Sequence, residues 1–304
     1  MSWRTVVIRG PAKLDLKIGQ MVVRKEPSVK VNLNEIGILM IENTSVSLTA
    51  ALLSELIRRK VKVIFCDEKC LPQFELVPYY GSHDTSAKVR AQIAWPALIK
   101  EQVWTEIVRE KIKNQALFLN NLKLPQALLL NQYVEELVAG DTTNREGHAA
   151  KVYFNALFGL EFTRSKEIPV NAALNYGYSI LLSGFSREIV AAGYITQIGL
   201  FHDNMFNPFN LASDLMEPFR PLVDRIVVEM NPQKFDTEEK TKLANLLNQE
   251  VAIAGKRQYL LNAIRVYCKS VFDVLNGEDM AEIKFYKLVA SKKSKIDVLV
   301  DDED

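Results

Sequence analysis

The sequence predicts an α+β protein with two domains: a small β-rich, β-sandwich-like N-terminal domain and a larger all-α C-terminal domain. The chain has 304 residues, which is enough for two hydrophobic cores. Short β-branched segments with period-two alternation come first, and helical periodicity follows almost to the end. We therefore expect a β-rich domain at 1–83, a helical domain at 84–288 and a mobile charged tail at 289–304.

Short strands bounded by glycine, proline or asparagine make up the predicted N-terminal domain. They are expected at 3–8, 13–18, 21–24, 29–33 and 37–41. A helix at 47–60 follows, because Leu48, Leu52 and Leu56 share one face and basic residues fill the last turn. The chain then returns to strands at 61–65 and 74–77.

Proline, glycine and asparagine mark the ends of the predicted helices in the second domain. Pro96 suits the first turn of a helix, whereas Pro125 and Gly140 separate the segments after it. Asn171 is expected to cap a long apolar helix that Gly193 terminates. Further helices are expected at 211–230, 237–254 and 256–276.

Composition places the chain among ordinary folded proteins. Hydrophobic residues make up 48% and charged residues 25%, which argues against long disordered segments. No stretch reaches the roughly 18–20 uninterrupted apolar residues of a bilayer span, and no leader precedes the strand-like residues 3–8. Three cysteines do not suit a disulfide framework or a closed zinc site. We expect a protein of the reducing cytoplasm, neither inserted in a membrane nor exported.

The charge balance does not by itself indicate a nucleic-acid-binding protein, because 38 basic and 37 acidic residues give a net charge of +1. Binding depends on local patches, however. Lys88 with Arg90, or Arg109 with Lys111 and Lys113, could meet phosphates. The simpler interpretation is that these clusters are solvated faces of helices.

The segment 211–226 carries the most informative pattern in the chain. In a helix, Asp214, Glu217 and Asp224 fall on one stripe, and apolar residues lie nearly opposite. A helix with one solvated face would explain this pattern. A mostly buried helix fits equally well, because few residues of the segment are otherwise polar. Its carboxylates would then need cations or a metal ion as partners.

Glu146 and His202 are further candidates for chemistry. Thr143 and Glu146 also form a capping-box pattern, in which Glu146 would only satisfy a backbone N–H group. His202 lies in a loop before the acidic helix, although a lone histidine is more often structural. Two carboxylates and an imidazole from these segments would suit Mg²⁺ or Mn²⁺, which can polarise a phosphodiester. Phosphoryl transfer on nucleic acid would follow.

Four segments carry a recognisable combination of motifs. They are Asn-Arg-Glu-Gly-His-Ala-Ala-Lys-Val-Tyr-Phe at 144–154, Ala-Leu-Asn-Tyr-Gly-Tyr-Ser-Ile-Leu at 173–181, Gly-Leu-Phe-His at 199–202, and Asn-Leu-Ala-Ser-Asp-Leu-Met-Glu-Pro-Phe-Arg-Pro-Leu-Val-Asp at 210–224. Together they closely resemble the CRISPR adaptation integrase family in its type II form, and the similarity covers nearly the whole chain. The resemblance implies that Glu146, His202 and Glu217 are the catalytic residues and the ligands of Mg²⁺ or Mn²⁺.

The resemblance also implies an activity and partners. The family consists of metal-dependent DNA endonucleases and integrases that join the 3′-hydroxyl ends of captured foreign DNA, the prespacer, into the CRISPR repeat by transesterification. We accordingly expect a prokaryotic cytoplasmic homodimer, formed through the N-terminal domain, that binds double-stranded prespacer, repeat and leader DNA. A small ferredoxin-like partner dimer is expected to bridge two homodimers. Other type II adaptation proteins and the effector nuclease are further candidate partners, and no membrane is involved.

Other residues near the motifs are expected to support the site. Candidates for orienting the ligands or lying near them are Asp214, Arg220, Asp224, Asn175 and Tyr176. Candidates for DNA contact are Lys88, Arg90 and Arg145. The alternative hypothesis is a non-catalytic DNA-binding scaffold of a nucleoprotein complex. An unrelated metallohydrolase with a small substrate is a third, weaker one.

Overall fold

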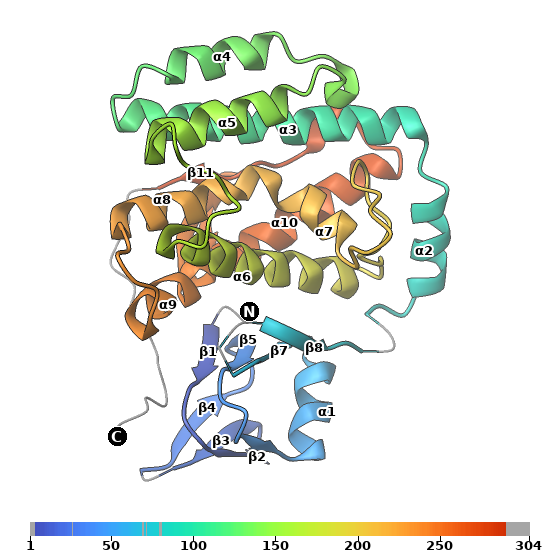
Figure 1. Ribbon diagram of the computed structural model, residues 1–304. Coiled ribbons are helices and arrows are strands. Elements are labelled where there is room, and N and C mark those ends of the chain that lie inside the picture. Colours follow the sequence, from blue (N-terminus) through green and yellow to red (C-terminus); the bar gives the residue numbers. More distant parts are fainter. Residues whose placement is uncertain (1–3, 26, 69, 71, 79–80, 290–304) are drawn as a thin grey trace.

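A helical body lies above two β-sheets, and the chain passes from the sheets to the helices at one side through α2 (Thr85–Ile93; Figure 1). The computed structural model describes residues 4–289, except 26, 69, 71 and 79–80. The arrangement confirms the predicted α+β fold, with a β-rich N-terminal part and a helical C-terminal part. The exact division of the chain into domains stays a prediction. The predicted tail lies outside the described residues, apart from residue 289.

The N-terminal part consists of two four-stranded sheets, of order β1-β5-β7-β8 and β4-β3-β2-β6. In the first sheet β1, β5 and β7 are parallel and β8 is antiparallel. The strands are β1 Arg4–Ile8, β2 Lys13–Lys17, β3 Gln20–Arg24, β4 Val29–Asn32, β5 Ile36–Ile41, β6 Ser47–Leu48, β7 Lys62–Cys66 and β8 Pro72–Leu76. All the predicted strands are present. The helix α1 (Ala50–Arg58) begins later than predicted, because the Thr49 side chain caps it by accepting the Leu52 N–H at 3.3 Å.

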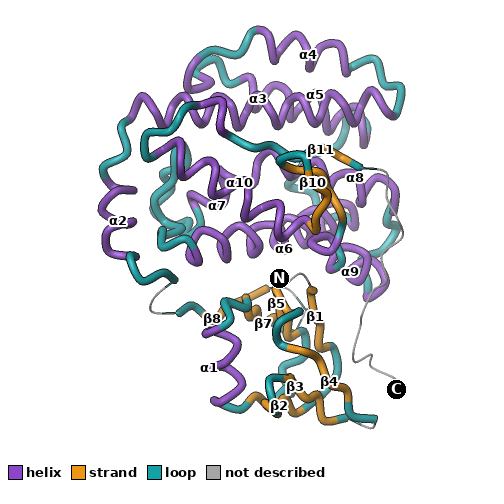
Figure 2. Tube along the Cα trace, turned by 180° about the vertical axis from the view of Figure 1, so that it is seen from behind, coloured by secondary structure: helices purple, strands orange, loops and turns teal. Residues whose placement is uncertain are grey.

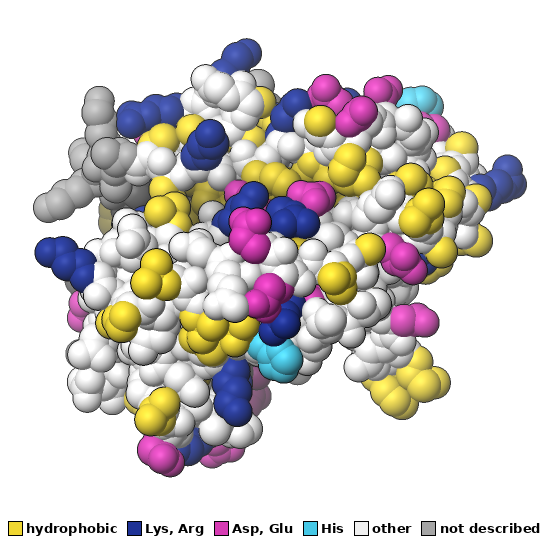
Figure 3. Space-filling view, turned by 90° about the horizontal axis from the view of Figure 1, so that it is seen from above, with side chains coloured by type: hydrophobic (Ala, Val, Ile, Leu, Met, Phe, Trp, Pro, Cys, Tyr) yellow, Lys and Arg dark blue, Asp and Glu magenta, His cyan; other side chains and the backbone are white. Residues whose placement is uncertain are grey.

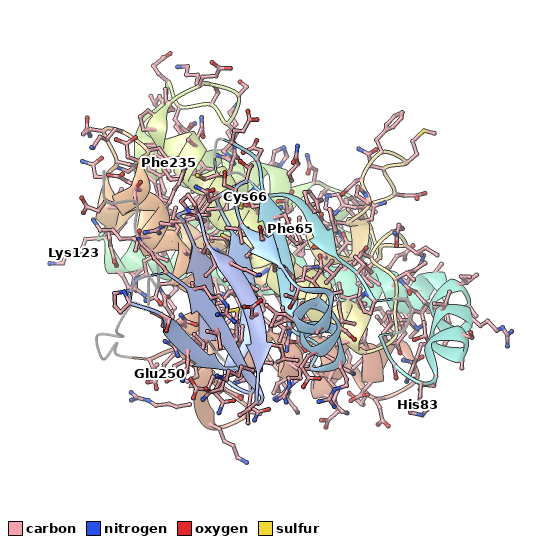
Figure 4. The ribbon with its side chains drawn as sticks, turned by 90° about the horizontal axis from the view of Figure 1, so that it is seen from below. Phe65, Cys66, His83, Lys123, Phe235 and Glu250 are labelled. Atoms are coloured by element: carbon pink, nitrogen blue, oxygen red, sulfur yellow. The ribbon has the colours of Figure 1, made fainter. Side chains whose placement is uncertain are left out.

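The first sheet is buried on both faces, and this joins the two parts of the fold. Along β7, Ile64 and Cys66 pack in the core of the helical body, whereas Val63 and Phe65 pack toward the second sheet. Figure 4 shows Phe65 and Cys66 on this sheet at the underside of the molecule. Successive strand residues point to opposite faces, so an almost continuous apolar run fits a parallel sheet covered on both sides.

Long helices build the helical body, in which α10 contacts both α3 and α6 (Figure 2). The helices after α2 are α3 Ala97–Asn121, α4 Ala127–Glu135, α5 Arg145–Phe158, α6 Pro169–Ala191, α7 Asn210–Met216, α8 Arg220–Met230, α9 Thr237–Ala244 and α10 Leu260–Leu275. Short 3₁₀ turns are η1 Ala139–Asp141, η2 Glu217–Phe219, η3 Leu246–Asn248 and η4 Met280–Glu282. Within the described ranges, no helix has the length and apolar character needed to span a bilayer.

A small sheet interrupts the C-terminal part, which is therefore not entirely α-helical as predicted. β9 (Glu250–Ile253) and β10 (Lys256–Tyr259) form a hairpin where the sequence predicted helices at 237–254 and 256–276, and β11 (Lys287–Leu288) pairs with β9. Ala254 and Gly255 form the connection with φ values of 49° and 73°. Two residues with positive φ make the turn that matches the twist of paired strands, and this local geometry overrides the helical periodicity.

Proline accounts for a second difference, in the segment predicted as one helix at 211–230. The structure divides it into α7, the 3₁₀ turn η2 and α8. Pro218 and Pro221 lack the backbone N–H groups that a continuous helix requires. The helix is therefore interrupted at η2, which contains Pro218, and resumes as α8 with Pro221 in its first turn. As a result Glu217 stands at a junction between two helices instead of on a regular helical stripe.

The start of α6 is a third difference. Asn171 does not cap this helix but lies in its first turn, because Pro169 occupies the first helical position and Ile168 is the capping residue. The Asn171 amide instead donates to the backbone oxygens of Thr163 and Lys166, both at 2.8 Å. At the other end Gly193 follows the helix with a φ of 91°, so the predicted termination is confirmed.

Close packing of α6 against α8 gives a test of the helical core. A Cβ atom at Gly177 would lie 2.4 Å from Val223 Cγ1, whereas one at Gly184 would come no closer than 3.3 Å, to the flexible end of Leu247. We expect Gly177→Ala to lower the free energy of unfolding by about 1–3 kcal/mol through overpacking. Gly184→Ala, the matched control, gains helix propensity and should be nearly neutral. Urea unfolding measures both, and equal stability of the two variants would contradict the observed packing.

Candidate active site

Two of the predicted acidic residues meet at one buried lysine. Lys111, on α3, donates from Nζ to Oε1 of Glu146 and to Oε2 of Glu217, the latter at 2.5 Å. Glu146 belongs to the first turn of α5, and Glu217 begins the turn η2. Three elements that are distant in the sequence therefore bring a pair of carboxylates to one cation.

The beginning of α5 frees the Glu146 side chain for this role. Asn144 adopts a left-handed conformation and caps the helix by accepting the Gly147 N–H at 3.3 Å. The Asp141 carboxylate accepts the backbone N–H groups of Arg145 and Glu146 at 2.7 and 2.9 Å. The capping-box alternative for Glu146 is thus wrong, because other side chains satisfy this helix terminus. The positive end of the helix dipole also favours a carboxylate here.

Glu217 is almost completely buried and carries a second cation. Its Oε1 atom accepts from Nε of Arg220 at 2.8 Å, and the Arg220 guanidinium lies 4.7 Å from the centre of the Tyr178 ring. Burial acts to raise the pKa of Glu217, but Arg220 and Lys111 outweigh it, so this pKa lies below its ordinary value. Glu217 is therefore ionised at neutral pH.

Asp214 fixes His202 and the loop that carries it. Asp214 is fully buried and accepts the backbone N–H groups of Leu200, Phe201 and His202 at 2.6, 3.1 and 3.1 Å. Its Oδ1 atom also lies 2.5 Å from Nδ1 of His202, and this hydrogen bond raises the histidine pKa. With Nδ1 engaged, Nε2 is the ring nitrogen left for another ligand. The Phe201 ring stacks on Trp104 of α3, with 4.5 Å between the centroids.

The side chains of Glu146, Glu217 and His202 are chemically suited to a divalent cation, but the Lys111 ammonium lies between the two glutamates. Across the described ranges, no three histidine, cysteine, aspartate or glutamate side chains lie close enough together to hold a metal ion. Glu146 and Glu217 are separated by the Lys111 ammonium, and the His202 ring is turned toward Asp214. Carboxylate oxygens and an imidazole oriented by a carboxylate are nevertheless the ligands that Mg²⁺ and Mn²⁺ use.

A cavity of about 240 Å³ opens beside the lysine. Residues of both charges line it, among them Lys111, Arg164, Arg220, Glu146, Glu217 and Asp224. Asp224 accepts a hydrogen bond from the Tyr178 hydroxyl, and burial raises its pKa to about 6. The same mixture of charge appears on the surface seen from above, where basic and acidic side chains are interspersed (Figure 3). Contacts to an anionic ligand therefore depend on a few positioned cations within the cavity.

Two other residues predicted near the site have different surroundings. Asn175 is connected to the cavity, because its Oδ1 atom accepts from Arg164 at 2.6 Å. Tyr176 points the other way: it is buried, and its hydroxyl donates to Glu42 Oε1 at 2.7 Å, at the boundary with the β-rich part. The structure thus brings Asp214, Arg220, Asp224 and Asn175 to the site or its walls but not Tyr176.

The predicted DNA contacts lie on two different helices, α2 and α5. Lys88 and Arg90 belong to α2, where Lys88 Nζ lies 5.7 Å from the centre of the Tyr194 ring. Arg145 pairs with Glu136 at 2.8 Å beside the Tyr133 ring. His83 is exposed at the periphery, just before α2 (Figure 4). Contact of Lys88, Arg90 and Arg145 with DNA stays a prediction.

Sequence reasoning did not single out Lys111, Trp104 or Arg164 as site residues. Lys111 was considered only as one member of a basic cluster with Arg109 and Lys113. In α3, however, Lys113 is exposed and Lys111 is 5% exposed, so the three do not form one patch. A lysine among the apolar positions of a long helix was the available signal, because a buried ammonium requires anionic partners.

The Asp214 hydrogen bonds predict how the His202 loop is held. Asp214→Ala leaves three backbone N–H groups and an imidazole without their acceptor. Each such loss typically costs about 1–3 kcal/mol, so we expect faster hydrogen exchange at residues 200–202 and a lower melting temperature. Asp203→Ala, which changes an exposed neighbour, is the control. Unchanged exchange in Asp214→Ala would show that this carboxylate does not hold the loop.

Burial of Asp224 predicts a pH dependence of stability. Its folded-state pKa of about 6 lies above the ordinary value of 3.8, so folding favours the protonated form. The contribution of Asp224 to the free energy of unfolding is therefore largest at low pH. As the pH rises from about 4 through 6, this contribution decreases by up to about 3 kcal/mol. Asp224→Asn cannot titrate, so its stability relative to the parent should increase between pH 4 and 7.5. A constant difference across thermal melts in this range would contradict the prediction.

Comparisons with known proteins place the chain in a family. A model of the family described as CRISPR associated protein Cas1 matches residues 6–253. The chain is 34% identical over 300 residues to the CRISPR-associated endonuclease Cas1 of Neisseria meningitidis serogroup C, covering 96% of this chain and 99% of the relative. It is 29% identical over 276 residues to a Cas1 endonuclease of Francisella tularensis subsp. novicida, covering 82% and 86%.

Solved structures share the fold. A casposase bound to its integration product has a TM-score of 0.72 at 17% identity, covering 92% of both chains. A Cas1 protein from Thermotoga maritima has 0.71 at 17% identity, covering 90% of this chain and 97% of the other. A Cas6-RT-Cas1–Cas2 complex has 0.70 at 18% identity, covering 92% and 36%. The predicted family and the predicted class of enzyme, a CRISPR-associated endonuclease, are confirmed. The chain belongs to the Cas1 family of CRISPR-associated proteins.

Proposed function

We propose that this protein is a divalent-metal-dependent DNA endonuclease and integrase that joins the 3′-hydroxyl ends of captured foreign DNA into the CRISPR repeat. The observation that carries the proposal is the meeting of Glu146 and Glu217 at one cation position. They lie in a cavity that also contains Arg164 and Arg220, within a chain that belongs to the Cas1 family. Acidic groups to hold a metal ion and basic groups to hold a phosphate are thus side by side.

Glu146, Glu217 and His202 are the proposed ligands of Mg²⁺ or Mn²⁺. When bound, such an ion polarises a phosphodiester and neutralises the charge that develops on it. Asp214 keeps the His202 ring in a fixed orientation through Nδ1. Arg220 is held against the Tyr178 ring and directs Nε at Glu217, so its position in the cavity wall is defined before substrate arrives.

The reaction that we propose exchanges one phosphodiester for another. The 3′-oxygen of the captured strand forms a new bond to the repeat phosphorus, and the bond from that phosphorus to the 3′-oxygen of the repeat strand breaks. The attacking hydroxyl loses its proton, and the released 3′-oxygen gains one to become a 3′-hydroxyl. Arg164 and Arg220 provide planar guanidinium groups suited to the non-bridging phosphate oxygens. Because the attacking group is a hydroxyl of DNA instead of water, the site must admit both the 3′ end of the captured strand and a phosphodiester of the repeat strand.

Double-stranded DNA and a second CRISPR-associated protein are the proposed partners. The similarity to a casposase bound to an integration product, and to the Cas1 part of a complex with Cas2, supports this. We also propose a homodimer formed through the β-rich part, with two homodimers bridged by a small ferredoxin-like dimer. In the β-rich part, the edge strand β8 and the residue after it form an exposed apolar edge, where Phe74 and Val77 are each 57% exposed. Lys88, Arg90 and Arg145 are proposed to contact DNA.

Removal of either glutamate charge tests the catalytic assignment. We expect Glu146→Gln and Glu217→Gln each to reduce the joining of a 3′-hydroxyl DNA fragment to a repeat-containing plasmid by about 100-fold or more, in Mg²⁺ or Mn²⁺. A loss of this size is expected because each variant removes a metal ligand, and the metal ion stabilises the transition state. Glu229→Gln is the control, because Glu229 is exposed on α8 and pairs with Arg225 of the same helix.

The outcome also separates an enzyme from a DNA-binding scaffold. A scaffold would bind repeat DNA but would join no strands, and its glutamate variants would behave like the parent. Full joining activity in a folded Glu146→Gln or Glu217→Gln protein would overturn the assignment. Circular dichroism and the melting temperature establish that each variant is folded.

A further inference from the structure

Lys111 is a buried cation inside the proposed metal site. It lies in the middle of α3, is 5% exposed, and has its ammonium between Glu146 and Glu217. Burial acts to lower its pKa, but Glu217 and Glu146 outweigh burial and keep the group protonated. An ammonium with such partners neutralises two carboxylates that would otherwise repel each other in a poorly solvated place.

The atoms that Lys111 contacts are those that a bridging metal ion needs. Glu217 presents Oε1 to Arg220 and Oε2 to Lys111, so both of its oxygens already have a cationic partner. Oε1 of Glu146 faces the same ammonium. A divalent ion that binds both glutamates must therefore take the place of Nζ, because an ammonium and a dication at contact distance repel each other strongly in a buried site.

The structure provides room for the displaced side chain. The cavity beside Lys111 has a volume of about 240 Å³ and is lined in part by Ala150 and Phe154 of α5. A lysine stem is a flexible chain of four carbons and Lys111 itself lines the cavity, so Nζ can turn into the cavity while the helix stays in place. The charges also balance before the ion arrives, since Lys111 and Arg220 offset Glu146 and Glu217.

We propose that Lys111 is a positioning residue that holds Glu146 and Glu217 side by side before the metal ion binds, and that the ion displaces its ammonium into the adjacent cavity. This inference rests on the proposed function, because it takes both glutamates as ligands. Two consequences follow. The pair of glutamates is already assembled without the metal ion, and the affinity for the ion is lower than the bare carboxylates would give, because the ion competes with a tethered cation.

The binding of Mn²⁺ without DNA tests this competition. Lys111→Met keeps a long side chain but removes the charge, so we expect its dissociation constant for Mn²⁺ to be at least about tenfold lower than that of the parent, measured by calorimetry on the full chain. Without metal, the variant should melt at a lower temperature than the parent. Addition of Mn²⁺ should raise its melting temperature by more than it raises that of the parent. Lys113→Met, an exposed position on the same helix, should bind within about twofold of the parent.

A second variant keeps the test valid if Lys111→Met does not fold. Lys111→Gln retains an N–H donor for the carboxylates without the positive charge, and the same tighter binding of Mn²⁺ is expected. Unchanged or weaker Mn²⁺ affinity in a folded Lys111→Met or Lys111→Gln protein would overturn the inference. A purely structural lysine would lower the melting temperature on substitution but would leave the gain from Mn²⁺ unchanged.

The parent protein and Glu146→Gln distinguish failure of this inference from failure of the proposed function. If the parent binds Mn²⁺, Glu146→Gln loses that binding and the Lys111 variants match the parent, only the role of the lysine is wrong. If Glu146→Gln binds Mn²⁺ as the parent does, the ligand assignment under the proposed function is itself wrong. If the Lys111 variants bind more tightly and Glu146→Gln loses binding, both stand.

Discussion

The pairing of buried charges at Lys111 is the interaction on which the candidate site depends. Glu217 is 4% exposed and Lys111 is 5% exposed, so neither could remain ionised there without a partner. Their requirement for one another draws α3, α5 and the turn η2 together, although each element is otherwise held by apolar packing. The two candidate carboxylates are thereby fixed at the wall of one cavity, with Glu217 buried and Glu146 partly exposed.

One face of α3 supports both halves of the site. Trp104 and Lys111 are separated by about two helical turns, so their side chains project in similar directions. Trp104 holds Phe201 by stacking and meets the edge of His202, and Lys111 holds the glutamates. His202 and the two acidic residues are therefore positioned relative to a single rigid element. Asp214 completes this support through the backbone of the loop.

The helix α6 connects this site to the β-rich part. Tyr178 contacts Asp224 and Arg220 on the side of the cavity, whereas Tyr176 reaches Glu42 at the end of β5. One face of the first sheet packs directly against the helical core, so the two parts of the fold share a hydrophobic interface. One helix, α6, therefore contacts both the β-rich part and the wall of the candidate site.

Local periodicity and motifs of adjacent residues were enough to predict most strands of the β-rich part, most of the helices, the family and the acidic candidates. It misplaced the cap of α6 and missed the hairpin at 250–259 and the division at Pro218, where a few turn or proline residues override the wider pattern. The cation that accompanies the glutamates is apparent only in the three-dimensional packing. Lys111 is 35 residues from Glu146 and 106 from Glu217, and no local pattern encodes a contact across such separations.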